Sequence, residues 1–475
     1  TSGGGPGAQP KVLIRGVTTV NGTDPLYVVD GMPVGTNINF LNSNDIESME
    51  VLKDASAAAI YGTRASNGVI LITTKKGMAE YKEVFNTRYT NDGGTSIWND
   101  TGATTNPGGT DWWDEVINKT ALVQNYSLNI SGGSDKLVYN LSMGYYRNNS
   151  QYDYGYWDKI NARLNTEYTF NKYKAKNNCY FAIFNYQRSY NNQEWNPAGS
   201  LARQNSHSRE MGTIVNTYLQ INPIQKLTLR TQFGANAHFR RTDKFTPEFY
   251  IDALEQSTLS NVSREMQEWL DWNWTNTATY ITTFAEKHNI NVMGGFTAER
   301  FAEFQSKASR DDVPNNMDQM QEVNAGTQNQ KSEGKTAYST LVSYLGRVMY
   351  NYDNRYYLTA SIRADGSSRF PKGNKYAIFP SVSASWRIIS ESFMQDQKIF
   401  SNLKLRGGWG RVGNQNIDND ATLTLLGQSD YVFGTAPGRV SGTMVSGVGN
   451  NLLKWETVED WNVGVDMSFL DSRLD

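Results

Sequence analysis

Strict alternation of apolar and polar residues dominates the chain from about Tyr81 onward. Between Tyr356 and Ala364 one set of alternate positions holds Tyr, Leu, Ala, Ile and Ala, and the other holds Tyr, Thr, Ser and Arg. A period of two is typical of a β-strand with one apolar and one wet face. The pattern predicts fourteen strands, near 81–91, 122–132, 136–149, 157–170, 174–190, 210–222, 225–241, 266–286, 288–304, 335–352, 355–366, 376–390, 402–412 and 460–470.

Short and long connections alternate between these strands. The short ones lie at 132–135, 222–223, 286–288 and 353–355, and the long ones at 92–121, 191–209, 242–265, 305–334 and 413–459. A soluble sandwich has no reason to place its long loops at one end, whereas an outer-membrane barrel has short periplasmic turns and long outer loops. We therefore favour a transmembrane β-barrel over a sandwich. Tyr350, Tyr352, Tyr356 and Tyr357 flank one short turn, where an interfacial aromatic girdle would lie.

The faces of the strands follow from the same alternation. Leu358, Ile362, Val463 and Val465 should face lipid, whereas Arg363, Ser383 and Asp466 should point into the lumen.

The first 78 residues have a different pattern, typical of a small α/β segment. A strand at 26–29 ends in the turn dipeptide Asp30-Gly31. Asp54 can cap a short helix at 55–61, and the turn after it leads into a strand at 69–74.

Composition narrows the class of protein. The 475 residues include 45 Lys plus Arg and 47 Asp plus Glu, so 45 − 47 gives a net charge of −2. This balance argues against a nucleic-acid binder, which carries a basic footprint. No stretch approaches the roughly 18–20 apolar residues of a spanning helix. The single cysteine, Cys179, cannot form an internal disulfide.

Enzyme chemistry has no positive support in the sequence. Residues 408–413 match the dinucleotide pattern GxGxxG, but a loop follows instead of a helix, so no amide cradle for a phosphate is expected. His207, His238 and His288 are far apart and lack metal-ligand spacing. We expect no catalytic residue, no metal and no cofactor.

Tryptophans in the long loops are candidates for recognition. Trp112, Trp113 and Trp195 can stack on sugar rings or fill a partner's pocket, and they can equally pack loop against loop.

Several motifs together resemble the SusC/RagA-type TonB-dependent transporters of the Bacteroidota outer membrane. They lie at 14–16, 25–33, 45–54, 57–70, 73–77, 344–347, 362–370, 379–382, 405–410, 413–414 and 453–456. The resemblance implies a barrel of about 22 strands around a plug domain in its lumen. Residues 1–78 would then be the C-terminal part of the plug, and residues 79–475 the N-terminal part of the barrel. On this interpretation the sequence is a fragment of a longer chain.

The resemblance also implies a function, location and partners. We expect active import of a large glycan or oligopeptide across the bacterial outer membrane. A SusD-like lipoprotein would hand over the substrate, and TonB would act on the plug through a segment outside this sequence. Two rivals remain: a passive porin, which would lack the plug at 26–77, and a signal-transducing receptor, which would carry an additional N-terminal domain.

Two groups of plug residues are candidate site residues. Arg15, Glu47, Glu50 and Arg64 are candidates for polar contacts with the barrel wall, or for salt bridges within the plug. The polar segment 35–40 follows the turn at Asp30, and its Asn37, Asn39 and Phe40 suit a hydroxyl-rich or peptide ligand. The alternative is a turn of the plug that contacts only the wall.

Overall fold

The structure is a computed structural model. It describes residues 12, 14, 24–35, 38, 41, 46–52, 61, 67–74, 84–91, 118, 120–150, 155–170, 173–187, 205–250, 256–314, 321–397, 399–433 and 438–469. No helix among them is long and apolar enough to cross a membrane.

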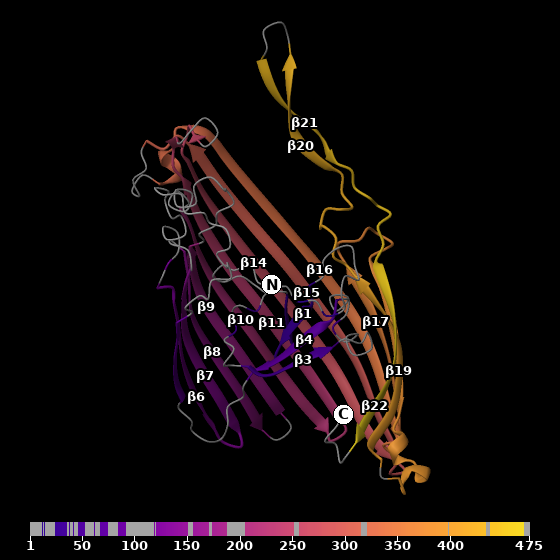
Figure 1. Ribbon diagram of the computed structural model, residues 1–475. Coiled ribbons are helices and arrows are strands. Elements are labelled where there is room, and N and C mark those ends of the chain that lie inside the picture. The colour runs from indigo at the N-terminus through magenta and orange to yellow at the C-terminus, as the bar shows by residue number, and fades with distance from the viewer. Residues whose placement is uncertain are drawn as a thin grey trace, which may run out of the picture.

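Fourteen strands form one antiparallel sheet in which neighbours in the sheet follow each other along the chain, apart from two inserted hairpins (Figure 1). They are β5 (Val84–Asn91), β6 (Leu122–Gly133), β7 (Leu137–Asn149), β8 (Tyr156–Phe170), β9 (Tyr173–Gln187), β10 (Asn205–Ile224), β11 (Leu227–Thr246), β14 (Asn261–Phe284), β15 (His288–Asp311), β16 (Gln328–Tyr352), β17 (Tyr356–Ser367), β18 (Tyr376–Trp386), β19 (Phe400–Asn414) and β22 (Glu456–Phe469). Each of the fourteen predicted strands coincides with one of them, so the alternation located the strands correctly.

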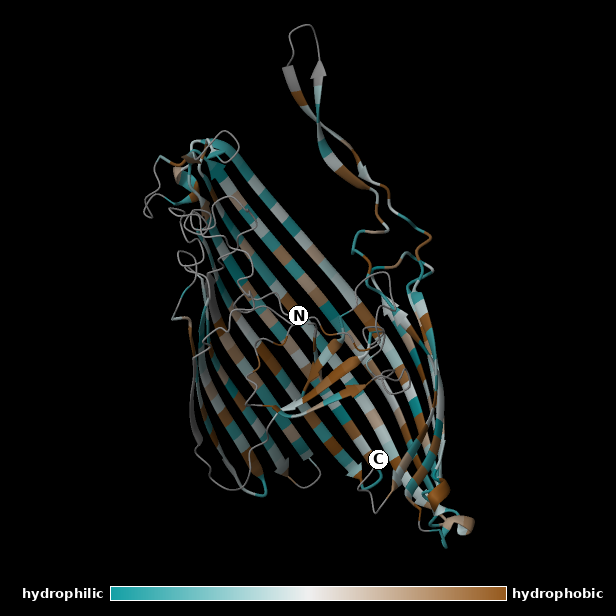
Figure 2. Cartoon of the chain, viewed as in Figure 1, coloured by the Kyte–Doolittle hydropathy of each residue, from teal (hydrophilic) through white to brown (hydrophobic). Residues whose placement is uncertain are grey.

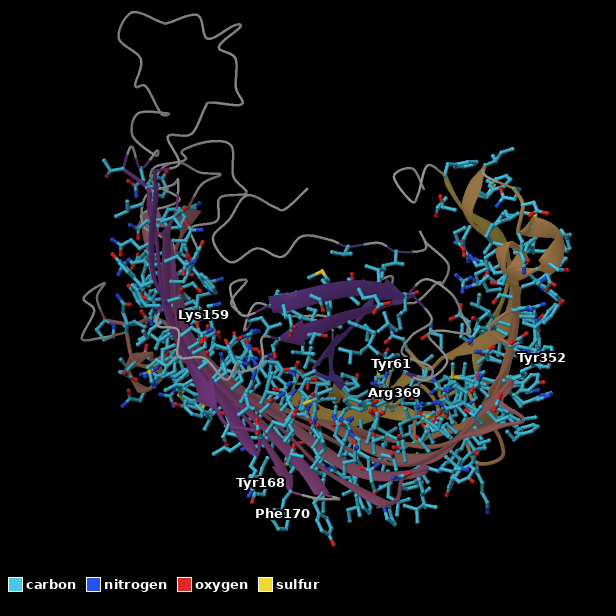
Figure 3. The ribbon with its side chains drawn as sticks, turned by 90° about the horizontal axis from the view of Figure 1, so that it is seen from below. Tyr61, Lys159, Tyr168, Phe170, Tyr352 and Arg369 are labelled. Atoms are coloured by element: carbon cyan, nitrogen blue, oxygen red, sulfur yellow. The ribbon has the colours of Figure 1, made fainter. Side chains whose placement is uncertain are left out.

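A second, four-stranded sheet lies in the hollow of the large one, as the view from below shows (Figure 3). Its strands are β1 (Leu26–Val29), β2 (Met32–Gly35), β3 (Ile46–Leu52) and β4 (Val69–Thr74), in the order β2-β1-β4-β3. β1 and β4 pair in parallel, and their apolar side chains form the core, with Val28, Val69 and Ile72 at most 1% exposed. The predicted helix at 55–61 lies almost wholly outside the described residues.

Apolar and polar residues alternate along the wall strands (Figure 2). On β17, Leu358 and Ile362 are 46% and 54% exposed, while Arg363 and Asp365, on the opposite face, are 5% and 0% exposed. Arg363 is held there by Asp365, 2.7 Å from its Nε, and by the Ser343 hydroxyl. The face that carries the small sheet is therefore the polar face, as predicted.

Aromatic rings form a continuous row on the outer face near the short turns. Ring centroids are 4.7 Å apart for Phe284 and His288, 4.9 Å for His288 and Tyr352, and 6.2 Å for both Tyr352–Tyr356 and Tyr356–Trp386. The expectation of four tyrosines in one girdle is wrong for Tyr357. It directly follows Tyr356 in the strand and so points to the inner face.

Three details of the connections differ from the sequence expectation. The turn expected at 222–223 lies after Ile224, because an irregularity between Ile221 and Ile224 accommodates Pro223 within β10. Residues 388–390 form the 3-10 helix η5 (Ile388–Ser390) instead of the end of a strand, and η6 (Ser392–Met394) follows. The outer loops contain η4 (Val323–Ala325) and the hairpins β12 (Phe249–Tyr250) with β13 (Gln256–Ser257), and β20 (Leu425–Phe433) with β21 (Gly438–Gly447).

The central strands are much longer than a membrane requires. β14, β15 and β16 have 24, 24 and 25 residues, whereas about 9–11 suffice to cross a bilayer. β16 pairs with β17 only from Leu341 onward, so its segment 328–339 pairs with β15 alone among the described strands. The long-loop end of the wall thus extends well beyond the apolar band.

Candidate functional site: the contact between the small sheet and the wall

The contact is centred on the hairpin that joins β1 and β2. Asp30 and Gly31 form its two-residue turn, and both have positive φ, +50° and +84°. An Asp-Gly pair suits this geometry because Asp tolerates the left-handed region and Gly has no Cβ. The turn presents the Asp30 carboxylate and carbonyl to the wall.

Asp30 forms hydrogen bonds with three strands, β4, β9 and β10. Its carboxylate accepts the Thr74 backbone amide of β4 at 3.0 Å and the Thr74 hydroxyl. The same group accepts the Asn178 side-chain amide of β9 at 3.0 Å, and the Asp30 carbonyl accepts the Asn216 amide of β10 at 3.2 Å. One acidic residue therefore stabilises the small sheet and also ties it to the wall.

The wall continues these contacts as a polar chain. Gln232 donates to the Asn216 side-chain oxygen at 3.0 Å, and Arg230 donates to Gln232 at 2.6 Å. The Arg230 guanidinium lies 3.9 Å from the centre of the Tyr218 ring. Such a network is stable only when each polar group in it has a hydrogen-bond partner, and water can supply that partner when the small sheet moves away.

Further contacts flank Asp30. Lys159 of β8 donates to the Leu41 carbonyl at 3.3 Å. A Cβ at Gly234 of β11 would lie 2.9 Å from the sulfur of buried Met32, so this glycine gives the small sheet room to approach. The contact therefore combines polar bonds with close packing at one glycine.

A second contact region involves Tyr61 and the wall residue Arg347. Burial and the nearby Glu50 carboxylate raise the pKa of the Tyr61 phenol, and the Arg347 guanidinium opposes that rise. Glu50 and Glu47 lie on β3 with exposed side chains and no ion pair to a described residue. Their role as wall contacts stays a prediction, with Glu50 close enough to act on Tyr61 electrostatically.

The other candidate residues from the sequence lie outside the described residues. These are Arg15, Arg64, Asn37, Asn39, Phe40, Trp112, Trp113 and Trp195. Sequence reasoning treated Asp30 only as a turn residue and missed its contacts with Asn178 and Asn216. A signal was present, because both asparagines occupy inward positions of strands that were placed correctly.

No described group of three or more His, Cys, Asp or Glu side chains could hold a metal ion.

Comparison with known proteins agrees with this architecture. Residues 1–69 match the family model of the TonB-dependent receptor plug domain. The chain is 28% identical to TonB-dependent receptor P26 of Formosa agariphila, over 99% of this chain and 53% of the relative. It is 29% identical to TonB-dependent receptor SusC of Bacteroides thetaiotaomicron, over 99% of this chain and 54% of the relative. The chain thus spans about half the length of these relatives.

Solved structures give the same picture. The structure of the RagAB peptide transporter matches with a TM-score of 0.86 and 25% identity, covering 100% of this chain and 63% of that one. The ferric citrate transporter FecA matches with a TM-score of 0.58 at 10% identity, covering 83% of this chain and 55% of that one, which supports the fold alone.

The large curved sheet and the small sheet within it are the barrel wall and plug of a TonB-dependent receptor, and the predicted fold class is confirmed. Within that class the chain is a SusC/RagA-like receptor. The family and the fold imply a place in the outer membrane.

Proposed function

We propose that the protein imports a large nutrient across the outer membrane when TonB displaces the plug. The observation that carries this proposal is the polar character of the plug–wall contact at Asp30. Each hydrogen bond from Asn178 or Asn216 to Asp30 can be exchanged for one to water, at a net cost of about 1–3 kcal/mol. Such a contact can open and close repeatedly, whereas separating a shared apolar core would expose it to water.

The substrate class and the partners belong to the same proposal. An oligopeptide is supported by the likeness to a peptide transporter, and a glycan remains the alternative. We further propose a SusD-like lipoprotein as the partner that delivers the substrate. The small sheet on the inner face argues against the passive porin, because a porin of this kind would have no plug.

A reversible cross-link between plug and wall tests the proposal. In a full-length protein without other cysteines, with Cys179→Ser, the pair Asp30→Cys and Asn216→Cys is joined by a short, cleavable thiol cross-linker. We expect uptake of labelled oligopeptides or oligosaccharides by whole cells to stop, and to return on cleavage.

The matched control joins two wall residues. Asn178 and Asn216 are register partners on β9 and β10, so cross-linked Asn178→Cys and Asn216→Cys leave the plug free and should permit uptake. Normal uptake with the plug cross-linked to the wall would show that transport does not require its displacement.

A further inference from the structure

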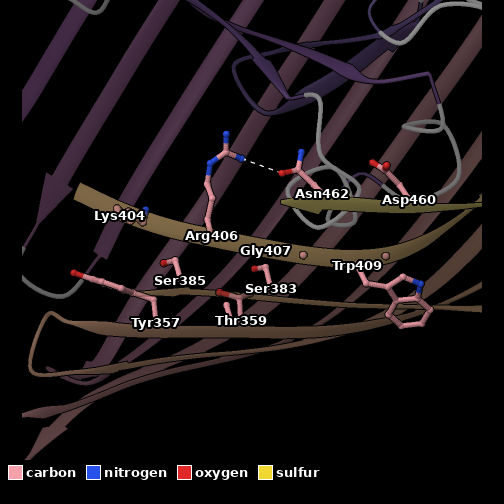
Figure 4. A pocket seen from close by; sticks show the side chains of 13 residues that line it. Tyr357, Thr359, Ser383, Ser385, Lys404, Arg406, Gly407, Trp409, Asp460 and Asn462 are labelled. Carbon is pink, nitrogen blue, oxygen red and sulfur yellow. Dashed lines mark hydrogen bonds between the residues drawn. The ribbon is translucent and has the colours of Figure 1, made fainter. Parts of the chain in front are cut away.

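A polar cavity of about 190 Å³ lies on the inner face of the wall, between β17, β18, β19 and β22 (Figure 4). It is close to the short-turn end, far along the chain from the Asp30 contact. A single water needs only about 10–15 Å³ of such space, so the cavity can admit a group of several atoms. Its size follows from the residues that form its floor.

Two cross-strand rows build the cavity. In one row Thr359, Ser383, Gly408 and Asn462 are successive register partners, and in the next row Tyr357, Ser385, Arg406 and Gly464 are. A glycine therefore interrupts each row. A Cβ at Gly408 would lie 3.3 Å from the Ser383 Cβ, and a Cβ at Gly464 would lie 2.9 Å from the Arg406 guanidinium carbon. The first glycine opens the floor, and the second lets the guanidinium lie flat against β22.

The positive charges in the cavity are not equally compensated. Arg406 donates to Asp466 at 3.1 Å and to Asn462 at 3.2 Å. Asp466 is the register partner of Lys404, yet its carboxylate pairs with Arg406. Lys404 has no ion pair or hydrogen bond to any described residue, and only the Tyr357 ring, 5.9 Å away, faces its ammonium group.

Hydroxyl groups line the same cavity as this ammonium group. Within the described part of the chain, the side chains of Thr359, Ser383 and Ser385 have no hydrogen-bond partner, and all three point to the same side of the sheet as Arg406 (Figure 4). The cavity thus offers a cation and three hydroxyl donors, while its one lining carboxylate, Asp460, pairs in register with Gly410, six residues along β19 from Lys404. This set matches the acceptor-only oxygens of a carboxylate.

We propose that this cavity is a subsite for a carboxylate group of the transported substrate, with Lys404 as its main anchor. The inference rests on the proposed import function, because an imported substrate passes this part of the lumen on its way to the short-turn end. Two substrate sources share the chemistry: the C-terminus or acidic side chain of a peptide, and the uronic acid of a glycan.

Binding measurements on the full-length protein in detergent separate this inference from transport. The probes are an oligopeptide with a free C-terminus against its C-terminal amide, and an oligogalacturonate against its methyl ester. A charge-assisted contact predicts a Kd about tenfold lower for the free acid. A preference in the peptide pair assigns a peptide carboxylate, and one in the sugar pair assigns a uronate.

Substitutions at Lys404 make the test specific. Lys404→Gln should give equal Kd values for the acid and neutral forms, whereas Lys404→Arg should retain the preference. Lys335→Gln, at an exposed lysine near the far end of β16, is the matched control and should behave like the natural protein. The inference is overturned by equal Kd values in the natural protein for both pairs, or by a preference that survives in Lys404→Gln. A natural protein that prefers the free acid but takes up no substrate would contradict the proposed import function and leave the carboxylate subsite supported.

Discussion

At the scale of single residues, Asp30 shows how one carboxylate serves two sheets. Each charge-assisted bond from Thr74 or Asn178 to this carboxylate is expected to contribute about 1.5–3 kcal/mol. The sequence predicted the turn, since Asp-Gly between two apolar runs has a local signature. It could not predict the contact, because that depends on which inward-facing residues of β9 and β10 come opposite the turn.

Asp30→Asn is expected to loosen the plug without altering its turn, because Asn also tolerates a positive φ. The side-chain NH2 of the new Asn would face the Thr74 hydroxyl and the Asn178 amide, which are both donors. The contact should therefore weaken, and the Thr74 backbone amide should exchange its hydrogen about tenfold faster. Hydrogen exchange followed by mass spectrometry on the full-length protein measures this. Asp24→Asn, at an exposed residue of the plug, should leave the exchange rate unchanged, and unchanged exchange in Asp30→Asn would contradict the role assigned to the carboxylate.

Glu391 makes the stability of the folded state depend on pH, and the direction of this dependence follows from its contacts. Hydrogen bonds from Tyr356 at 2.7 Å and Trp386 at 2.9 Å, together with the Arg355 charge, hold the pKa of its carboxyl below the usual range. Because the folded-state pKa is lowered, this stabilisation is present above the ordinary carboxyl pKa, about 4.3. It is lost as the pH falls through the folded-state value.

We therefore expect Glu391→Gln to show a smaller fall in urea midpoint than the natural protein between pH 5 and about pH 3. Glu286→Gln, at an exposed residue of the short turn between β14 and β15, should keep the full fall. Parallel curves for Glu391→Gln and the natural protein would show that this group does not contribute.

At the scale of elements, the wall strands were predictable and the inserted hairpins were not. The strands β17 and β22 alternate strictly because one face meets lipid and the other water. Among the described strands, none pairs with the hairpin β20–β21, so no neighbouring sheet imposes a regular pattern on these two strands. Strand ends such as that of β18 were also misjudged, since the 3-10 turns at 388–394 keep apolar residues without alternation.

Motif residues from distant parts of the sequence meet at the long-loop end of β17–β19. The ring centroids of Phe370 and Trp455 are 4.6 Å apart, and those of Phe379 and Trp455 are 5.6 Å apart. Phe370 and Phe379 are buried, at 1% and 4% exposure, and Phe379 covers Gly413. These contacts explain why the motifs occur together: they form one aromatic cluster that closes the end of the wall.

Gly413→Ala should destabilise this cluster, because the new Cβ would lie within the space of the buried Phe379 ring. Overpacking of this kind costs about 1–3 kcal/mol, measurable as a lower urea midpoint of the full-length protein in detergent. Gly407→Ala places its Cβ 3.7 Å from the nearest atom, the Asn462 carbonyl oxygen, and should be tolerated. Equal midpoints for the two variants would exclude the ring contact as the reason for the glycine.

At the scale of the whole molecule, one face of the wall is expected to contact lipid and the other water. Leu358, Ile362, Val463 and Val465 are 46%, 54%, 83% and 50% exposed on the outer face. Ser383 and Asp466 lie on the face that carries the plug, in line with Arg406. The sequence alone could predict this division, because alternation assigns faces without any knowledge of the loops.

Cysteines labelled with a fluorophore can test the division in lipid vesicles. We expect a lipid-soluble quencher to reach labels at Ile362→Cys and Val465→Cys, and a water-soluble quencher to reach labels at Ser383→Cys. All labelled variants also carry Cys179→Ser, which removes the natural thiol. Equal quenching of both sets by the lipid-soluble agent would contradict a membrane-spanning wall.

The unpaired edge of the long strand β16 affects how copies of the protein can contact one another. Segment 328–339 exposes a row of backbone amides and carbonyls that a neighbouring copy could extend by adding a strand, which is how edges seed aggregates. The segment carries Lys331, Glu333 and Lys335, all exposed, and Gly334 between them. Charge and a residue of low strand propensity at such an edge make each added strand costly, so this edge resists extension by a strand from a second copy.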